Sequence, residues 1–212
     1  MRPTPAWIRR VLPRRARPDR RVVGLFGGSF DPIHHGHLLV GLAAVEALGL
    51  ESLRFVPAHT QPFKVGRHGA TPAQRAAMVA LAIEGEPRFA LEQVELERGG
   101  PSYTVDTLRA LKVREPGVEF ALLVGADAAA ELGSWREADA LPGLARVVAL
   151  TRGGTPAPAS SLVWRTLAVP AVEISATDVR ARVRAGASLR WRVPDAVARY
   201  IAAERLYLDP ER

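Results

Sequence analysis

The sequence predicts an α/β fold in which a doubly wound parallel sheet carries helices on both faces and is followed by a C-terminal helical segment. Short apolar runs alternate along the chain with segments of helical period, and this alternation is typical of parallel sheets covered by helices. The chain has 212 residues, 48% of them hydrophobic and none of them cysteine. That length supports one core that needs neither a disulfide nor a zinc site.

Residues 21–212 are expected to form one domain. Expected strands are short apolar or alternating runs, and expected helices carry apolar residues three or four positions apart. Gly49 is expected to stop the first helix and Thr71-Pro72 to cap the second. The expected strands are 22–26, 53–56, 89–96, 119–124 and 146–150. The expected helices are 36–48, a segment from 72, 104–113, 127–132, a short helix after Trp135, 177–186 and 195–205. The helix from 72 is expected to place Met78, Leu81 and Ala82 on its core face, and residues 151–162 are expected to form a loop.

Residues 1–20 are expected to form a basic, disordered arm. They hold four prolines, seven arginines and one aspartate, with no helical or strand period. A transit peptide and a start codon assigned too early are alternatives for this segment. The net charge of the chain is +7, but residues 21–212 carry 22 basic and 21 acidic side chains, so the domain lacks the basic excess typical of nucleic-acid binding.

The apolar runs, such as Leu38–Val45, are far shorter than the roughly 18–20 residues of a membrane span. No apolar stretch of the secretory kind follows the first arginines. We therefore expect a cytoplasmic protein with neither a membrane nor a nucleic-acid partner. The oligomeric state is left open.

The segment GGSFDPIHHGHL, residues 27–38, carries the first functional motif. It is the expected turn from the first strand into the first helix, at the sheet edge where ligands bind. Gly27 and Gly28 let the backbone approach a ligand, and His34 and His37 can point the same way from the helix start. Together with the helix N–H groups they predict a phosphate site. A purely structural turn, a metal-binding histidine pair and a redox dinucleotide turn are alternatives, although the glycines do not fit G-x-G-x-x-G.

The segment ISATDVR, residues 174–180, carries the second motif. Ser175 and Asp178 fit the S-x-x-D capping box, which an ordinary helix also uses. Helical side chains lean toward the helix N-terminus, so Arg180 can reach back to an anion held there. Beside the first motif, this segment predicts a second phosphate clamp.

Together these motifs resemble the HxGH-type nucleotidyltransferases and, more narrowly, the bacterial nicotinate-nucleotide adenylyltransferase family. The resemblance runs from about Val22 to Tyr207. It implies a Rossmann-like fold and adenylyl transfer from ATP to nicotinate mononucleotide, giving deamido-NAD and pyrophosphate, with Mg²⁺ carried on ATP. It rests on GGSFDPIHHGHL, GGPSYTVDTL (99–108), LLVGADAAAELGSW (122–135), ISATDVRARV (174–183) and VPDAVARYIAAERLY (193–207).

For ATP, the resemblance and the two motifs assign catalytic roles to His34, His37 and Arg180, which would hold the phosphates. Asp127 is similar to the family acid that accepts hydrogen bonds from ribose hydroxyls; a helix cap is its alternative. No metal ligand is assigned to the protein. The remaining residues expected at ATP are Gly27, Gly28, Ser29, Phe30, Gly125, Ile174, Ser175 and Thr177.

For the mononucleotide, Trp135 is the candidate platform under the pyridine ring. By resemblance, Tyr103 and Thr104 lie in the segment that presents backbone N–H groups to the nicotinate carboxylate. Lys64 would reach the mononucleotide phosphate. The chain departs from the usual family pattern in having Ser29 for threonine, Gln61-Pro62-Phe63-Lys64 for PPHK, and Ala176 at a hydroxyl position.

Other functions compete with this one. A phosphopantetheine adenylyltransferase or a cytidylyltransferase of the same superfamily would share the first motif, but the former is shorter and lacks the PSYT and GAD…W segments. A non-catalytic nucleotide- or nucleic-acid-binding module would depend on the basic arm. Deleting residues 1–20 would abolish such binding, whereas the enzyme is expected to keep its turnover.

Overall fold

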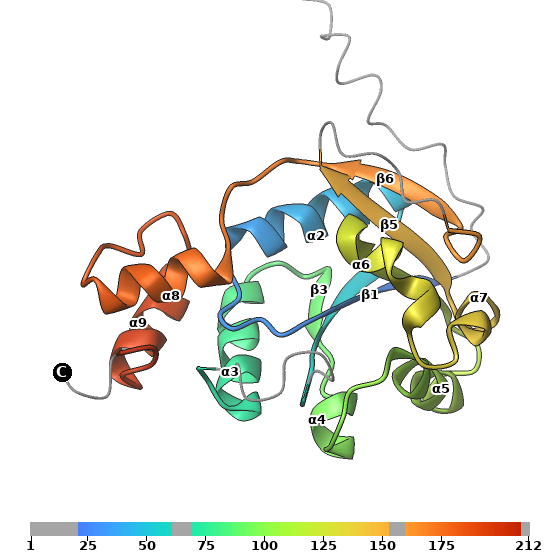
Figure 1. Cartoon of the computed structure of the whole chain (residues 1–212), viewed down its shortest axis with the longest axis horizontal. Coiled ribbons are helices and arrows are strands. Elements are labelled where there is room, and N and C mark those ends of the chain that lie inside the picture. The colour runs from blue at the N-terminus through green and yellow to red at the C-terminus, as the bar shows by residue number, and fades with distance from the viewer. Residues whose placement is uncertain (1–20, 61–68, 153–159, 209–212) are drawn as a thin grey trace, which may run out of the picture.

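A computed structural model describes residues 21–60, 69–152 and 160–208 (Figure 1). Its centre is one sheet of six parallel strands in the order β3-β2-β1-β4-β5-β6. This order confirms the doubly wound prediction, and it brings β1 and β4 together at the point where the winding direction reverses. The strands are β1 (Val22–Gly28), β2 (Ser52–Pro57), β3 (Phe89–Leu91), β4 (Glu119–Gly125), β5 (Arg146–Arg152) and β6 (Arg165–Val169).

Helices cover both faces of the sheet (Figure 1). The first core cluster packs side chains of α2, α3, α8 and α9 on one face, and the second core cluster packs those of α5, α6 and α7 on the other. The helices are α2 (His35–Leu48), α3 (Pro72–Ile83), α4 (Val94–Arg98), α5 (Thr104–Arg114), α6 (Ala126–Ala130), α7 (Leu141–Leu144), α8 (Ala176–Arg184) and α9 (Asp195–Ala203), with 3₁₀ turns at Leu132–Ser134 and Ala138–Ala140.

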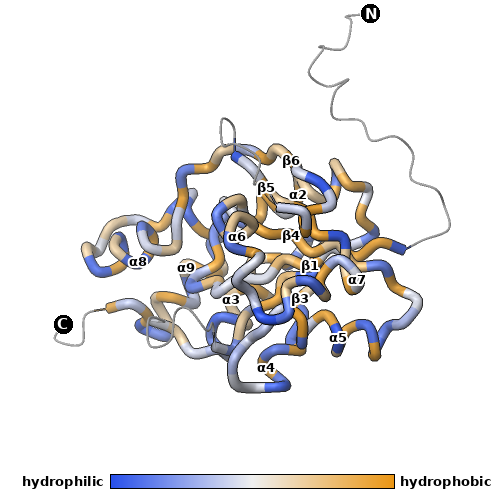
Figure 2. Tube along the Cα trace, turned by 45° about the vertical axis from the view of Figure 1, so that its right-hand side comes forward, coloured by the Kyte–Doolittle hydropathy of each residue, from blue (hydrophilic) through white to orange (hydrophobic). Residues whose placement is uncertain are grey.

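The central strands are apolar because both of their faces are buried. Along β4, Phe120 and Leu122 enter the second core cluster while Ala121 and Leu123 enter the first. Figure 2 shows the hydrophobic colour gathered along these strands and more mixed colour on the outer helices. A rigid core of this kind fixes the strand ends from which the site is built.

The predicted helix boundaries at α2 and α3 are confirmed. Gly49 ends α2 with a left-handed φ of 62° and donates its N–H to the Val45 carbonyl, as expected of a glycine stop. The Thr71 hydroxyl accepts the Gln74 N–H at the start of α3. The predicted core face of α3 is confirmed, with Met78 fully buried and Leu81 and Ala82 partly buried against the first core cluster. Arg75 and Val79, which were not predicted there, are also fully buried.

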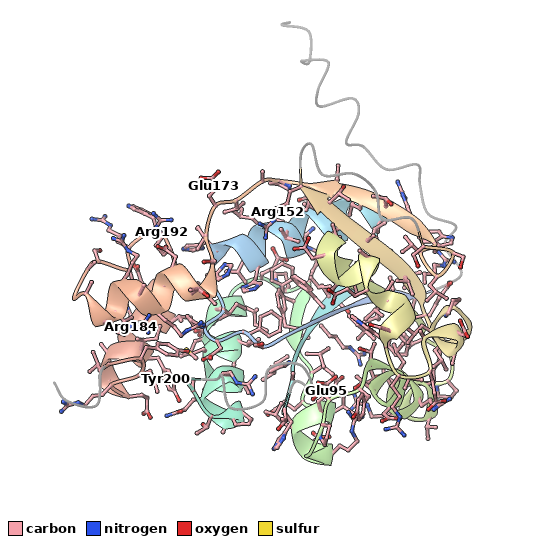
Figure 3. All side chains as sticks on the ribbon, in the orientation of Figure 1. Glu95, Arg152, Glu173, Arg184, Arg192 and Tyr200 are labelled. Atoms are coloured by element: carbon pink, nitrogen blue, oxygen red, sulfur yellow. The ribbon has the colours of Figure 1, made fainter. Side chains whose placement is uncertain are left out.

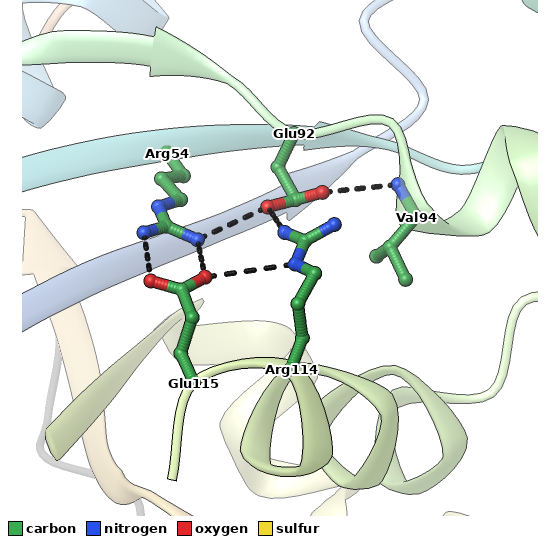
Figure 4. A network of polar contacts seen from close by, with 5 residues as sticks. All are labelled: Arg54, Glu92, Val94, Arg114 and Glu115. Carbon is green, nitrogen blue, oxygen red and sulfur yellow. Dashed lines mark hydrogen bonds and ion pairs between the residues drawn. The ribbon is translucent and has the colours of Figure 1, made fainter. Parts of the chain in front are cut away.

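The expected strand at 89–96 is wrong beyond Leu91. The Glu92 N–H still bonds to the Phe55 carbonyl, but its carboxylate turns back to accept the Val94 N–H at 3.1 Å, and α4 begins there. Figure 4 shows that the same carboxylate also holds Arg54 and Arg114. The ion pairs therefore end the strand, although the alternating sequence favours its continuation.

The strand β6 was not predicted. It pairs with β5 at the sheet edge, and only Leu167 and Val169 among its residues are buried. The N-terminal arm and Lys64 lie outside the described residues.

Candidate active site

A cleft of about 790 Å³ opens at the carboxyl ends of β1, β4 and β5, beside the starts of α2, α6 and α8. This is the sheet edge at which the winding reverses, as expected for a ligand site. Of the twelve residues predicted at ATP, all but Gly27 line the cleft. The eleven are Gly28, Ser29, Phe30, His34, His37, Gly125, Asp127, Ile174, Ser175, Thr177 and Arg180.

The turn between β1 and α2 is shaped by close packing around Phe30. Phe30, and not a glycine, has the positive φ of this turn, 49°, a conformation uncommon for a bulky residue. A Cβ at Gly28 would lie 3.0 Å from the Phe30 ring. A side chain at Gly28 would therefore require the Phe30 ring to shift, while Gly27 has open space around it and does not line the cleft.

Asp31 ties this turn to the end of the domain. The Tyr207 hydroxyl donates to Asp31 Oδ1 at 2.7 Å, and the Gly69 N–H donates to Oδ2 at 2.9 Å. Burial, together with the charge of Asp31, raises the pKa of Tyr207 far above its usual value, so the phenol stays protonated as the donor. The segment after α9 thus holds the turn in place.

His34 and His37 point to the same side, as their spacing predicts. Their rings stack with centroids 3.7 Å apart and planes inclined by 27°. The backbone N–H of His34 donates to His37 Nδ1 at 3.2 Å. A neutral ring that accepts at Nδ1 carries its proton on Nε2, so His37 is an N–H donor for a ligand in the cleft. His35 does not line the cleft.

Both imidazoles are neutral at pH 7. Burial, reinforced by the nearby charges of Arg152 and His35, lowers the pKa of His34 to about 4. Burial also lowers the pKa of His37 well below its usual value, with further contributions from His34 and Arg152. The Nδ1 of His34 is buried and has no hydrogen-bond partner among the described residues.

The start of α8 forms the opposite wall of the cleft. Ser175 Oγ accepts the Asp178 N–H at 3.0 Å, which confirms the predicted cap. Arg180 reaches back, as predicted, and donates to the Asp31 carbonyl at 2.6 Å and to Thr177 Oγ1 at 3.2 Å. Gly36 leaves room for the His34 ring, since a Cβ there would lie 3.0 Å from that ring, while the Ile174 carbonyl, before the start of α8, would be at an ordinary contact distance of 3.6 Å.

Arg152, at the end of β5, lines the cleft and was not predicted. Figure 3 shows it where β5 ends, near the start of α2. It forms no ion pair with any described residue, yet its charge acts on both histidines. Its position at the end of a buried strand was the available signal, because the carboxyl ends of parallel strands meet at one edge.

Asp127 lies in the first turn of α6 and lines the cleft. Gly125 occupies the N-cap position of this helix. The capping alternative for Asp127 is therefore wrong, and its carboxylate is available to the cleft.

The mononucleotide residues do not line this cleft. Tyr103 is the N-cap of α5 and Thr104 opens that helix, whose first N–H groups have no intrahelical acceptor. Tyr103 and Trp135 both pack against the second core cluster, and the Arg136 guanidinium lies 4.8 Å from the centroid of the Tyr103 ring. They form a second group on the α5 side of the sheet, while Lys64 lies outside the described residues.

Comparisons with known proteins identify the family. Residues 25–182 match the family described as cytidylyltransferase-like. A protein of Gemmatimonas aurantiaca named probable nicotinate-nucleotide adenylyltransferase is 44% identical over 90% of this chain and 94% of its own. One of the same name from Thermus thermophilus is 45% identical over 87% of this chain and 98% of its own. The chain belongs to the nicotinate-nucleotide adenylyltransferase family.

Solved structures share the fold of this nucleotidyltransferase. Nicotinic acid mononucleotide adenylyltransferase of Plasmodium falciparum, complexed with NaAD, superposes with a TM-score of 0.74 at 19% identity, covering 89% of this chain and 98% of the other. Its complex with APC gives a TM-score of 0.71. At this identity the likeness establishes the Rossmann-like fold. In the described ranges, no helix is both long and apolar enough to cross a membrane.

Proposed function

We propose that this chain transfers the adenylyl group of ATP to nicotinate mononucleotide and releases deamido-NAD and pyrophosphate. The observation that carries the proposal is the convergence of two helix starts on one cleft, with His34 and His37 from one and Arg180 from the other. The name shared by relatives that match nearly the whole chain supports the choice of acceptor. The proposal implies a cytoplasmic enzyme that acts on small molecules.

The reaction requires two anions to be held in line. A phosphate oxygen of the mononucleotide attacks the α-phosphorus of ATP, and the new P–O bond forms as the bond from that phosphorus to the oxygen bridging to the β-phosphate breaks. The electron pair of that bond leaves with pyrophosphate, so no covalent intermediate with the protein is needed. Positioning and stabilisation of the moving charge then supply the catalysis.

The cleft residues suit that task. We assign His34 and His37 to the ATP phosphates, where the Nε2–H of His37 and the first N–H groups of α2 donate hydrogen bonds. We assign Arg180, with Ser175 and Thr177, to the β- and γ-phosphates. Its present acceptors are neutral oxygens, and a phosphate would be the stronger partner because charge-assisted hydrogen bonds are about twice as strong.

We assign Asp127 to the ribose hydroxyls of ATP. Gly28 and Ser29 lie beside the phosphates in this arrangement. Mg²⁺ would enter as part of the MgATP substrate, neutralise the triphosphate and keep mainly phosphate and water ligands. The described residues hold no group of three or more His, Cys, Asp or Glu side chains suited to a metal, and we assign Mg²⁺ no protein ligand.

We assign the acceptor, nicotinate mononucleotide, to the second group of residues, on the α5 side of the sheet. Trp135 would stack on the cationic pyridine ring, and the N–H groups around Tyr103 and Thr104 would bind its carboxylate. Lys64 would reach the mononucleotide phosphate. Binding the carboxylate through charge-assisted bonds would favour the acid over the amide form.

One assay tests the proposal. The purified chain is given MgATP with nicotinate mononucleotide, nicotinamide mononucleotide or phosphopantetheine, and pyrophosphate release is followed. We expect the fastest release with nicotinate mononucleotide, together with deamido-NAD, and the same rate after residues 1–20 are deleted. Preferred turnover of phosphopantetheine, or no turnover of any acceptor, would overturn it.

A further inference from the structure

Arg75 is a charged side chain in the interior of the domain. It lies on α3 with 0% of its surface exposed. Its Nη1 donates to the Ser29 carbonyl at 2.7 Å and its Nη2 donates to the His59 carbonyl at 3.0 Å, while Nε has no partner among the described residues. Burying a guanidinium is costly, so a position that needs only packing would be better filled by an apolar residue.

One end of Arg75 holds the ATP turn. Ser29 lies in the turn between β1 and α2, between Gly28 and Phe30, all three of which line the cleft. Arg180 holds the carbonyl of Asp31 in the same turn. Two guanidinium groups thus fix two carbonyls of one turn, one from the interior and one from the cleft.

The other end of Arg75 leads to the segment assigned to the mononucleotide. The N–H of His59, whose carbonyl Arg75 binds, donates to Ser102 Oγ at 2.9 Å, and the Ser102 N–H donates to the Thr60 carbonyl at 2.9 Å. Thr60 also bridges to Pro101. Ser102 directly precedes Tyr103, the N-cap of α5.

The α5 end of this path is itself fixed by buried contacts. Thr107 Oγ1 donates to Glu95 Oε1 at 2.7 Å and lies 3.2 Å from the Tyr103 carbonyl. Glu95 comes from α4, in the lower part of Figure 3, whereas Arg152, which lines the cleft, lies in the upper part. Through its two acceptors, Arg75 therefore links the ATP turn to the segment that precedes α5.

We infer that Arg75 is a positioning residue that sets the spacing between the ATP turn and the segment preceding α5, so that the attacking phosphate meets the α-phosphorus in line. The inference rests on the proposed function. Two sites that each bind their substrate still react slowly when their separation is wrong, since in-line transfer depends steeply on geometry. Loss of Arg75 should therefore reduce turnover far more than the binding of either substrate alone.

The test compares Arg75→Lys with Arg54→Lys. Lysine keeps the charge but cannot span two carbonyls with a planar fork. Arg54 is also largely buried and donates hydrogen bonds to two acceptor groups, but these are the carboxylates of Glu92 and Glu115, which do not line the cleft. It therefore controls for the general loss of an interior guanidinium. Wild-type turnover of MgATP and nicotinate mononucleotide is measured first, because its absence would refute the proposed function and not this inference.

For Arg75→Lys we expect kcat to fall at least ~30-fold, with the Kd of ATP and that of nicotinate mononucleotide, each measured alone by calorimetry, within about threefold of wild type. Arg54→Lys should lower the thermal midpoint and leave kcat within about twofold. A kcat loss in Arg75→Lys no larger than in Arg54→Lys, or a parallel loss of both affinities and of the thermal midpoint, would show a merely structural role.

Ser102→Ala keeps the inference testable if Arg75→Lys fails to fold. It removes the hydroxyl that receives the His59 N–H and should lower kcat by about threefold to tenfold without changing either Kd. In the double variant the two losses should be smaller than additive, because both act on one path. An unchanged kcat in Ser102→Ala overturns the inference.

Discussion

Two groups of charged residues in this domain differ in how their charges are matched. In the ion-pair network of Arg54, Glu92, Arg114 and Glu115, every guanidinium faces a carboxylate, and Arg54 Nη2 lies 2.7 Å from Glu115 Oε2 (Figure 4). In the cleft, Arg152 and Arg180 have no carboxylate partner among the described residues. The network joins α5 to β2 and to the end of β3 by ion pairs, whereas no ion pair joins the described residues that line the cleft.

The difference separates charges whose interactions stabilise the fold from charges that remain available to bind a ligand. Matched charges at the network raise the pKa of Arg54 through its hydrogen bond to Glu115 and lower the pKa of Glu115 through the same bond, so their interaction is already used in folding. The cleft instead holds two guanidinium groups with no carboxylate partner in the part of the chain that the structure describes, and two neutral imidazoles. Its donors are available to an anion, and we expect substitutions there to affect activity and those at the network to affect stability.

The largest effect is expected from His37→Ala. It removes an N–H donor aimed into the cleft, and losing one such donor costs ~100-fold or more in turnover. Steady-state rates with MgATP and nicotinate mononucleotide measure it, and circular dichroism checks the fold. His35→Ala is the matched control, since this neighbour does not line the cleft. Near-wild-type turnover in His37→Ala would contradict the proposed role of His37 as a donor to the ATP phosphates.

His34 should make stability depend on pH. Its pKa is about 4 in the folded protein and about 6.5 when unfolded, so below pH 6.5 the unfolded state binds a proton that the folded state does not. The free energy of unfolding should therefore fall by about 2 kcal/mol from this residue between pH 7 and pH 5. Urea unfolding at both pH values checks this.

The variant His34→Gln should lose that part of the pH dependence, because glutamine does not titrate. The matched control is His35→Gln. An identical slope of stability against pH in wild type and His34→Gln would contradict the neutral, buried imidazole.

Glu115→Gln tests the same comparison in the ion-pair network, where we expect a loss of stability without a loss of activity. Removing the negative charge leaves Arg54 with Glu92 alone, and breaking part of a half-buried ion pair should cost about 1–2 kcal/mol in the free energy of unfolding. Turnover should stay within twofold of wild type. The Glu115 pKa is lowered by Arg54, so the stabilisation should also fade as the pH drops below the usual carboxyl range. A large loss of kcat without a loss of stability would contradict the assignment of the network to stability alone.

The smallest effect is expected from Arg152→Gln. We expect the KM for ATP to rise about tenfold, as for the loss of one charge-assisted hydrogen bond. Because the Arg152 charge lowers the His34 pKa, that pKa should rise, and an NMR titration of the ring protons would show it. Arg165→Gln, on the edge strand β6, is the control. No change in either quantity would mean that Arg152 serves only as a surface residue.

Local signals predicted most of the fold and much of the cleft. Runs with one clear period, a capping threonine at Thr71 and a stopping glycine at Gly49 gave the correct elements, and the two motifs gave both walls of the cleft. The failures share a physical cause. The strand at 89–96 is cut short by ion pairs from β2 and α5, and β6 is held by its pairing with β5, so both depend on contacts between distant segments.

The arginines show the same limit within the site. Arg180 was predicted because a helix start and a helical turn place its side chain locally. Arg75 could not be singled out among the 27 arginines of the chain, because its role depends on which loops lie against α3. Arg152 has only a strand-end signal, and its use requires knowing which strand ends meet. Sequence motifs thus locate the groups that touch the substrate more readily than those that set the distance between them.

The bond between Tyr207 and Asp31 joins the last described turn to the first loop of the domain. During synthesis on the ribosome, β1 and the histidines at the start of α2 emerge early. Arg180 of the opposite wall and Tyr207, which bonds to Asp31, emerge more than 140 residues later. For most of its translation, a nascent chain therefore contains the histidine wall of the triphosphate site but not the wall that carries Arg180. Truncated products that end before α8 should be unable to consume ATP, however well their sheet has formed.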